Sequence, residues 1–595
     1  MMKTPHPSDW PAIQYTIWSA DLNGHRFHVK LRIDNPLPSG QIVQMPSWIP
    51  GSYLIRDFSK HIETIQAYVA DKPNQPLTLE RIDNDQWRLP NVVGPVDILT
   101  TVYAFDSSVR TAYLGTDRAF INASSLCLSV KGQELLPCAL VLIPPQDASA
   151  DDWTVQTSLR AAKVDSQGYG FYLAKNYDDL LDHPIALGVF QIAHWKSNGV
   201  SHSMAIQGCI HEVDLARLAI DLQAICTCTI DLFEPATKQA PFENYLFLVN
   251  AVLAGYGGLE HRDSTALLCR RDQIPQIHTP LDETAYREFL GLCSHEYFHA
   301  WLVKRIQAKA FQPYQLHRRN HTRLLWLFEG FTSYYDDLQL LRSKRIDLKT
   351  YLKLVANHWN GVLRGPGRHK QSLADSSFDA WTKYYQADEN TPNAVVSYYG
   401  KGALLALGLD LQIRMFTLNE LSLDDLMRLI WQRHGLTMNG IAEDGLNDLM
   451  MELLGPGFHK TWSAFKARYI FGVEDIPLQK WFDQNYISVQ TKAYTKLEKI
   501  KLQLGMRHVD SNGWLKISHV LDGGAAQLAG LAPGDLLASI NGERITAARL
   551  DIILSSLVSK QVITISFYRD DLEHQCMTTL EENQMPAQYA LTAAH

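Results

Sequence analysis

The spacing of apolar and polar positions changes character twice along the chain. Up to about residue 175, short runs with every second position apolar alternate with turn residues, which predicts β-strands in one or two sandwich-like units. From about 176 to 490, apolar residues recur mainly at the 3.6-residue spacing of helices. Short strands around one helix return over 491–585. We therefore expect a multidomain α+β chain with domains over 1–175, 176–490 and 491–585, followed by a tail over 586–595.

Individual elements can be located within these regions. The clearest expected strands lie at 13–19, 26–33, 245–252, 265–269, 514–520 and 561–568. The clearest expected helices lie at 350–361, 402–416 and 423–434. The pattern therefore gives a β-rich beginning, a largely helical middle and a small mixed end.

Composition and charge narrow the class of protein. The 595 residues are 46% hydrophobic and 20% charged, as in globular proteins, so a mainly disordered or coiled-coil chain is excluded. The net charge of −8 argues against a nucleic-acid partner and a polybasic membrane anchor. The sequence shows no secretory signal and no apolar stretch of about 18 residues. With eight scattered cysteines, typical of a reducing compartment, it predicts a cytoplasmic protein.

The strongest chemical signal is the pentapeptide His295-Glu296-Tyr297-Phe298-His299. On a helix, residues at i and i+4 share one face, so the two imidazoles can hold one Zn²⁺. Glu296 then lies where it can take a proton from a water molecule at the metal. The pattern predicts a zinc-dependent hydrolase, and a pair of core histidines beside a salt-bridged Glu is the alternative.

The flanking residues favour a buried helix around this motif. Thr279, with Pro280 in the first turn and Asp282 three residues on, is typical of a helix start. Apolar residues surround the motif, and Lys304 and Arg305 suit the negative end of the helix dipole. We therefore expect a helix that Thr279 caps and that ends near these two cations.

A zinc site of this kind needs a third protein ligand, and Glu329 is the candidate. It lies 30 residues after His299, in the otherwise apolar stretch 325–335. This interval allows a second helix to return beside the first, and a buried acid must be paired or bound to a metal. Asp336 and Asp337 follow closely, and we expect both to face solvent.

Two other segments can complete a site for peptide hydrolysis. Gly257 and Gly258 precede Glu260 between two apolar strands, so the backbone can approach an extended peptide and Glu260 can bind an α-ammonium group. Tyr398 and Tyr399 open a helix, and a tyrosine hydroxyl can donate to an oxyanion. Taken separately, a glycine-rich turn with an acid and packed tyrosines at a helix start are common structural features.

Taken together, these motifs favour a peptidase over the separate structural interpretations. The order Gly-x-x-Glu, His-Glu-x-x-His, Glu-Gly-Phe and Tyr-x-Lys-Gly resembles the zinc aminopeptidases of the gluzincin class, such as aminopeptidase N and leukotriene hydrolase. The specific resemblance is to the glycyl aminopeptidase family whose members end in a PDZ domain, and it extends over nearly the whole chain. Three segments carry it: HEYFH, LWLFEGFTSYYDDL and WIPGSYLIRDFS. It implies a β-rich N-terminal domain, a thermolysin-like catalytic domain with a mostly helical C-terminal part, and a C-terminal PDZ domain.

The resemblance also implies roles for the metal-centre residues. It implies that His295, His299 and Glu329 bind one Zn²⁺ per chain and that Glu296 is the general base. The implied substrates are peptides from which a small N-terminal residue, Gly or Ala, is removed.

Further roles are implied for the substrate-binding residues. Tyr399 takes the position of the family tyrosine, and Tyr398 is the adjacent alternative. Glu260 matches the acid that binds the substrate amine, and His261 stands where aminopeptidase N has Asn. Gly257 and Gly258 belong to the same strand motif.

The C-terminal module has its own implied site. Leu504, Gly505 and Met506 match the loop of a PDZ domain whose backbone N–H groups receive a peptide C-terminus beside an exposed strand. These three residues depart from the usual Gly-Leu-Gly-Phe form. Two roles of this module therefore remain possible: it binds peptide C-termini weakly, or it only packs against the catalytic domain.

Three other functions fit parts of the same pattern. An endopeptidase with the same zinc centre would cleave N-blocked peptides and would not need Glu260. An epoxide hydrolase similar to leukotriene hydrolase would use peptides poorly. A peptide-binding protein centred on the PDZ domain would need no zinc, although the intact motif with Glu329 argues against it. The sequence favours the aminopeptidase.

Overall fold

The computed structural model describes residues 10–484, 487–581 and 585–593. These residues form two compact units. The first unit comprises the chain up to 320 with 335–346 and 427–442, and the second comprises 321–334, 347–426 and the chain from 443 onward. One continuous helix, α4 (Leu325–Arg342), contributes its first turns to the second unit and its later turns to the first. Within the described ranges, no helix is long and apolar enough to cross a bilayer.

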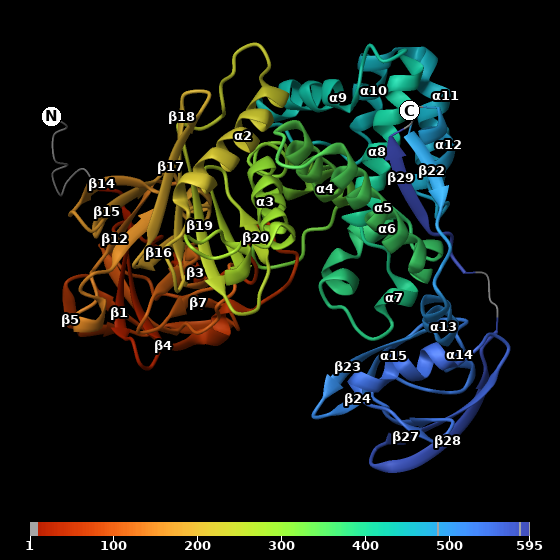
Figure 1. The fold of residues 1–595 in the computed structure, drawn as a ribbon. Helices are drawn as coiled ribbons and strands as arrows, with labels where there is room; N and C mark the ends of the chain where they lie inside the picture. The colour runs from red at the N-terminus through yellow and green to blue at the C-terminus, as the bar shows by residue number, and fades with distance from the viewer. Residues whose placement is uncertain (1–9, 485–486, 582–584, 594–595) are drawn as a thin grey trace. The chain divides into compact units, whose positions relative to one another are not determined.

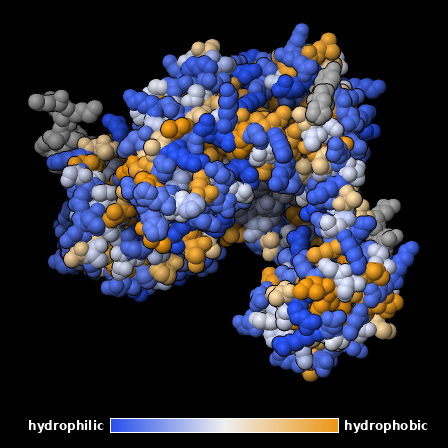
Figure 2. Space-filling model, viewed as in Figure 1, coloured by the Kyte–Doolittle hydropathy of each residue, from blue (hydrophilic) through white to orange (hydrophobic). Residues whose placement is uncertain are grey.

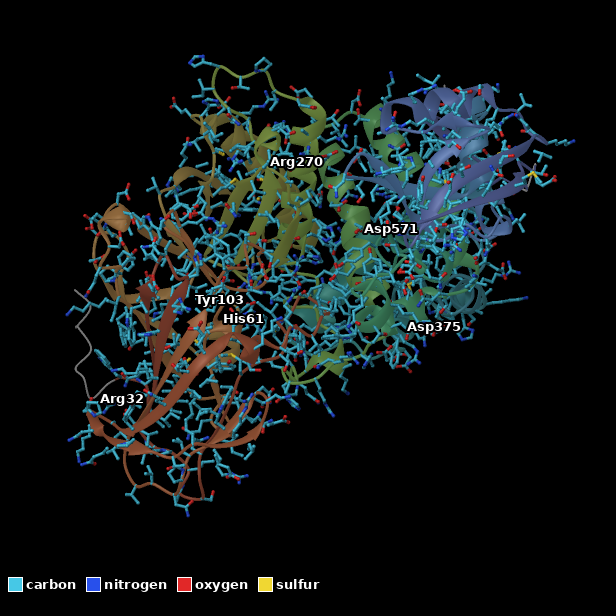
Figure 3. All side chains as sticks on the ribbon, turned by 90° about the horizontal axis from the view of Figure 1, so that it is seen from below. Arg32, His61, Tyr103, Arg270, Asp375 and Asp571 are labelled. Carbon is cyan, nitrogen blue, oxygen red and sulfur yellow. The ribbon has the colours of Figure 1, made fainter. Side chains whose placement is uncertain are left out.

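The first unit begins with β-sheets, drawn in red and orange in Figure 1, and its first two strands alternate buried and more exposed residues. β1 (Ile13–Asp21) pairs antiparallel with β2 (Arg26–Ile33), which confirms both expected strands. Their inward positions are large aliphatic and aromatic residues, which form the core of this β-rich region. At the rim, Arg32, labelled in Figure 3, pairs with Asp34 and Asp71.

Three sheets make up this β-rich region. The eight-stranded sheet has the order β14 (Arg160–Val164), β15 (Gly170–Ala174), β12 (Cys138–Leu142), β1, β2, β8 (Val96–Tyr103), β4 (Ile62–Val69) and β5 (Lys72–Leu77). A four-stranded sheet has the order β13 (Thr154–Thr157), β16 (Ile185–Gly188), β10 (Ala119–Ile121) and β9 (Tyr113–Leu114). A second four-stranded sheet has the order β11 (Ser129–Val130), β3 (Ile42–Gln44), β7 (Gln86–Arg88) and β6 (Glu80–Asp83).

The strand pairing continues past the boundary that the sequence pattern suggested at 175. After the short helix α1 (Tyr177–Leu181), β16 pairs with both β10 and β13. Its residues are all buried, and they begin a β stretch that the sequence predicts near 185–202. The β-rich region therefore includes residues up to 188.

A five-stranded sheet follows, with the order β17 (Gln191–Ser197), β18 (Val200–Gln207), β19 (Asn244–Val252), β21 (Ser264–Arg270) and β20 (Gly257–Glu260). β18, β19 and β21 run parallel, while β20 lies antiparallel at the edge. Helices α2 (Leu215–Phe233) and α3 (Glu283–Phe298) pack on this sheet, as Figure 1 shows. The edge strand thus lies beside α3, which carries the His-Glu-x-x-His motif.

The second unit is mostly helical, as expected for the middle of the chain. The expected helices at 350–361 and 402–416 are confirmed. The one at 423–434 is helical throughout, as an α-helix up to Ile430 and as a π-helical turn over Trp431–Gly435. Its helices before the C-terminal region, with α9 shared between units, are α5 (Leu348–Arg364), α6 (Leu373–Phe378), α7 (Thr391–Ala394), α8 (Gly400–Phe416), α9 (Leu423–Ile430), α10 (Leu446–Leu454), α11 (His459–Phe465) and α12 (Leu478–Asp483).

The C-terminal region has its own core of aliphatic residues. Its sheet has the order β23 (Met506–Ser511), β24 (Trp514–Val520), β25 (Leu536–Ile540), β27 (Val562–Arg569) and β28 (Leu572–Thr579), and β26 (Glu543–Arg544) pairs with β25. Helices α13 (Lys496–Leu504), α14 (Ala525–Leu528) and α15 (Ala547–Ser556) complete it. Figure 2 shows hydrophobic residues on its surface. Its exposed apolar side chains include Val509 of β23, which is 51% exposed, and Ile552 of α15, which is 70% exposed.

Of the tail expected over 586–595, the last two residues lie outside the described ranges, and the described part ends in a strand. β29 (Tyr589–Ala593) pairs antiparallel with β22 (Ile487–Thr491). Asn360 of α5 exchanges two hydrogen bonds with the backbone of Tyr589, whose ring stacks on Trp359 at 4.1 Å. The sequence pattern could not reveal this strand, because it is short and gains its stability from partners far away in the chain.

Candidate active site

Helix α3 carries the metal-binding motif in a buried position. Its N-cap is Asp282, whose carboxylate accepts the N–H groups of Thr284 and Ala285, so the expected cap at Thr279 is wrong. The positive end of the helix dipole stabilises a carboxylate, so Asp282 is well suited to cap the start of this helix. The helix ends at Phe298, and His299 keeps helical backbone angles as the C-cap.

The two cations expected at the end of this helix have other partners. Nζ of Lys304 lies 2.6 Å from the Asp182 carboxylate, and Arg305 lies 2.8 Å from Asp263. Lys304 is 3% exposed, so its charge belongs to an internal ion pair rather than to the helix end.

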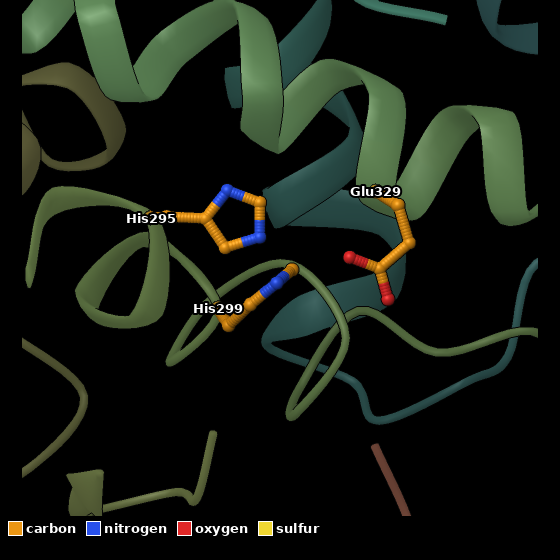
Figure 4. A group of neighbouring side chains, drawn as sticks. All are labelled: His295, His299 and Glu329. Atoms are coloured by element: carbon orange, nitrogen blue, oxygen red, sulfur yellow. The ribbon is translucent and has the colours of Figure 1, made fainter. Parts of the chain in front are cut away.

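His295, His299 and Glu329 meet as the sequence predicted. One potential ligand atom from each lies within 4.8 Å of the others, and Figure 4 shows both imidazoles and the carboxylate converging. The two rings have centroids 4.6 Å apart and are nearly perpendicular. His299 and Glu329 are buried, and His295 is half-buried.

Asp336 orients one of these candidate metal-binding side chains. Its carboxylate accepts a hydrogen bond from Nδ1 of His295 at 3.0 Å, so the expectation that Asp336 faces solvent is wrong. Asp336 lies seven residues after Glu329, two turns along the same face of the continuous helix α4. That spacing is the signal that could have identified it as a partner of the histidines.

This donor set fits a divalent cation such as zinc. The acceptors at Nδ1 are Asp336 for His295 and the Leu302 carbonyl, at 3.1 Å, for His299. Because a carboxylate and a carbonyl only accept hydrogen bonds, both Nδ1 atoms carry the hydrogen, and Nε2 of each ring has the lone pair that could coordinate a metal ion. Two imidazoles and one carboxylate are the ligand set of catalytic zinc sites.

A second cluster adjoins the first. Glu260, Glu296 and His299 are all buried and offer atoms within 4.8 Å of one another. Gly258 makes room for this cluster, since a β-carbon built on Gly258 would overlap the Glu296 carboxylate. Edge strand β20 can therefore approach α3 only with glycine at this position.

Gly51 is a further residue that the sequence did not single out for this site. A β-carbon built there would lie 2.6 Å from Oε1 of Glu260, and the backbone φ of Gly51 is +95°. Both observations require glycine. Gly51 lies in the segment WIPGSYLIRDFS, for which no role in the site was expected, and its glycine after Ile49-Pro50 was the available signal.

His261 faces away from the carboxylate cluster. Its Nδ1 lies 3.3 Å from Asp182, which also pairs with Lys304 and Arg262. Burial acts to raise the pKa of Asp182, but the charges of Lys304 and Arg262 hold it well below its ordinary value. Adjacent residues of a strand point to opposite faces, so this network anchors β20 from behind Glu260.

In the second unit, Tyr399 lies near Glu329. It is the N-cap of α8, its hydroxyl is 3.4 Å from that of Tyr385, and burial together with the Glu329 charge raises its pKa well above the ordinary value. It is therefore a protonated hydrogen-bond donor. Tyr398 is fully buried, stacks on Tyr399 and packs at a tilt against Tyr384, whereas Tyr399 is half-buried.

Two glycines explain how α8 reaches α4. A β-carbon built on Gly330 would lie 2.6 Å from the Cα of Gly402, and one built on Gly402 would lie 2.8 Å from the Cα of Gly330. The helices therefore touch backbone to backbone. This contact holds the start of α8, with Tyr399, beside Glu329.

The expected carboxylate-binding loop lies at the junction of α13 and β23. Leu504 ends α13, Gly505 is its left-handed C-cap, and Met506 begins β23. The N–H of Gly505 donates to the carbonyl of Lys501 at 3.1 Å, so this group is already used to close the helix. β23 is an edge strand of its sheet.

Comparisons with known proteins agree with this architecture. Family models match three segments: the peptidase M61 N-terminal domain over residues 14–189, the M61 glycyl aminopeptidase over 288–405 and the PDZ domain over 495–566. Among curated proteins the search finds no match.

Solved structures include one near relative. The aminopeptidase N family protein from Idiomarina loihiensis is 37% identical, with 98% of each chain covered and a TM-score of 0.91. An M1 zinc metallopeptidase from Deinococcus radiodurans is 12% identical (76% of this chain and 93% of that chain, TM-score 0.45). The native LTA4 hydrolase of yeast is 11% identical (76% and 66%, TM-score 0.43). Given the first of these relatives and the matched segments, the chain belongs to the M61 glycyl aminopeptidase family and is a metallopeptidase with a C-terminal PDZ domain.

Proposed function

We propose that this chain is a zinc aminopeptidase that hydrolyses the first peptide bond of peptides and prefers Gly or Ala at the N-terminus. One Zn²⁺ per chain is held by His295, His299 and Glu329. The family description, glycyl aminopeptidase, supports the preference for small N-terminal residues.

One observation carries the exopeptidase assignment. The buried carboxylate of Glu260 offers an oxygen within 4.8 Å of those of Glu296 and a nitrogen of His299. A substrate α-ammonium bound to Glu260 therefore lies within one residue of the groups proposed to act on the peptide bond. A protonated amine also relieves the repulsion between two buried acids, which a blocked amine cannot do.

The remaining steps follow from the chain's own residues. Glu296 takes a proton from the attacking water at a carboxylate oxygen and then delivers it to the leaving nitrogen. The protonated hydroxyl of Tyr399 donates to the oxygen on which negative charge develops. When bound, zinc supplies Lewis acidity, which acidifies water and polarises a carbonyl. Gly257 and Gly258 let the peptide backbone approach along β20.

Replacing Glu260 tests the aminopeptidase assignment. Glu260→Ala should lower kcat/KM for alanyl p-nitroanilide about 100-fold or more, because a charged hydrogen bond and the orientation of the amine are both lost. Activity on the N-acetylated substrate should change far less. Glu243→Ala, an exposed acid just before β19, is the control. Equal losses on both substrates would favour an endopeptidase.

Two further assignments go with this proposal. The edge strand β23 is the proposed binding site for peptide C-termini, with Leu504, Gly505 and Met506 as its loop. The cytoplasmic location is supported by the cysteines, since all eight are free in the structure.

A further inference from the structure

The open edge of the five-stranded sheet carries a cation that the proposed mechanism does not use. Nη2 of Arg110 donates a hydrogen bond to the carbonyl oxygen of Gly258 at 3.0 Å. A β-carbon built on Gly257 would lie 3.7 Å from both Nη atoms of the same guanidinium. Arg110 is thus held against the strand that leads to Glu260.

Backbone geometry places this contact on the side where a peptide would bind. β20 is the last strand in its sheet. The N–H of His261 bonds to the carbonyl of Ser264, and the carbonyl of Leu259 accepts from Thr265, each at 3.0 Å, so both point toward β21. Since backbone groups alternate sides along an antiparallel strand, those of Gly258 point to the open edge.

The loop that holds Arg110 is firmly anchored. Buried Asn122 donates from Nδ2 to the carbonyls of Val109 at 2.8 Å and Thr111 at 3.1 Å, the two neighbours of Arg110. The backbone N–H of Arg110 also donates to Oγ of Ser108 at 3.3 Å. Because the backbone is fixed on both sides, little conformational freedom is lost when the guanidinium binds a ligand.

The guanidinium still has donors to offer. Within the described part of the chain, no carboxylate pairs with Arg110, and the hydrogen bond to Gly258 uses only one of the N–H donors on its Nη atoms. Its Nε is buried and has no hydrogen-bond partner among the described residues. A guanidinium of this kind is best satisfied by a carboxylate, which it can bind through two parallel hydrogen bonds. Arg110 also occupies the carbonyl of Gly258, so a longer peptide strand cannot pair with that acceptor.

We propose that Arg110 binds the C-terminal carboxylate of the substrate and that free dipeptides are the preferred substrates. This inference rests on the proposed aminopeptidase function, in which Glu260 binds the amine. Gly258 is two residues from Glu260, a distance of about 6.6 Å at the rise of a β-strand. An extended dipeptide spans about the same length from amine to carboxylate. Arg110 is therefore a specificity-determining residue.

The test compares glycylglycine with glycylglycinamide, which differ only in the terminal charge. The wild-type chain should favour glycylglycine in kcat/KM by about 10–100-fold, the effect of a charge-assisted hydrogen bond. In Arg110→Met this ratio should fall to near one, and Arg110→Lys should retain part of it. Arg160→Met, an exposed arginine of β14, should keep the full ratio and serves as the control.

Two outcomes would overturn the inference: a wild-type ratio near one, or a ratio that Arg110→Met retains because both substrates lose activity equally or not at all. Glycyl p-nitroanilide, which has no carboxylate, reports the proposed function separately. If it is not cleaved, the proposed function fails. In that case calorimetry still tests Arg110, by measuring how tightly glycylglycine and glycylglycinamide bind to the zinc-loaded Glu296→Gln chain. Equal affinities for the two compounds would refute the role of Arg110.

Discussion

Two buried carboxylates within 4.8 Å of each other, on Glu260 and Glu296, are costly without a compensating cation. At an effective dielectric constant of 20 their repulsion is about 3–4 kcal/mol. A dication at the histidines offsets this repulsion, and so does a substrate ammonium group. The electrostatics of these residues therefore explain why one site can favour both a metal and a free amine.

Asp336 offers a test of how His295 is held. Asp336→Asn should weaken zinc binding about 10–100-fold, because the amide orients His295 less well and leaves it less basic. Zinc affinity measured by competition with a chelator checks this. Asp337→Asn is the matched control. Burial and the charge of Asp336 raise the pKa of Asp337 to about 8, so its carboxyl group is mostly protonated at neutral pH. An amide resembles a protonated carboxyl group, so this substitution should change zinc binding little. Equal weakening in both variants would contradict the role of Asp336.

Lys401 gives a prediction about pH. Its side chain is buried, and burial lowers its pKa from 10.5 to about 8. Between these values the unfolded chain binds a proton that the folded chain does not, so this residue makes stability rise with pH, by up to about 3 kcal/mol. Lys401→Met should remove this rise. Unfolding by urea at pH 8 and pH 10 measures it, and an unchanged pH dependence in the variant would refute the assignment.

At the scale of elements, the site depends on three close approaches of backbone. β20 passes Glu296 at Gly258, the loop at Gly51 touches Glu260, and α8 meets α4 at Gly402 and Gly330. Each approach needs a glycine, because a side chain would occupy the space of a functional group or of another backbone. These glycines therefore determine which elements reach the site.

Gly402 tests the contact between α8 and α4. Gly402→Ala should destabilise the chain by about 1–3 kcal/mol, because the new methyl group forces the helices apart. It should also lower peptidase activity, since Tyr399 moves with α8. Gly361→Ala in α5 is the matched control, because nothing lies within 4 Å of a β-carbon there and the change should stabilise by about 0.5–1 kcal/mol. Similar melting temperatures for both variants would contradict the close contact.

The residues around the motifs predicted the site helices but not the ends of these helices or the partners of their side chains. The pattern around His295 indicated a buried helix, yet Asp282 begins it in place of Thr279. Both residues are good caps, and only the fold selects between them. Asp336 was taken for a surface acid because sequence gives a residue's position on a helix but not which neighbour that face meets.

At the scale of the molecule, the C-terminal region is inserted between two strands that pair with each other. β22 leads into it and β29 follows it, and both belong to the second unit. Lys370 pairs with Asp522, and Asn393 exchanges hydrogen bonds with Val520 and Asp522. The PDZ domain is therefore attached at both of its ends and through a lateral contact within this unit.

Local motifs and distant pairings differ in how far they can be predicted. Motifs such as His295–His299 and the expected strand at 514–520 depend on neighbours in the chain, and the structure contains both. The pairing of β29 with β22, and the approach of Arg110 to β20, depend on residues about 100 or more positions apart. No periodicity records such contacts, so only the fold reveals them.

The central claim is that zinc and Glu296 act together on peptides with a free amine. The most direct measurement is the zinc content of the wild-type and Glu296→Gln chains, together with hydrolysis of glycyl and alanyl p-nitroanilides and their N-acetylated forms. Glu288→Gln, an exposed acid on α3, is the control. We predict one zinc in each chain, cleavage of the free amines by wild type, and an activity about 10²–10⁴-fold lower in Glu296→Gln. Full activity in that variant, or equal cleavage of the acetylated substrates by the wild type, would contradict the claim.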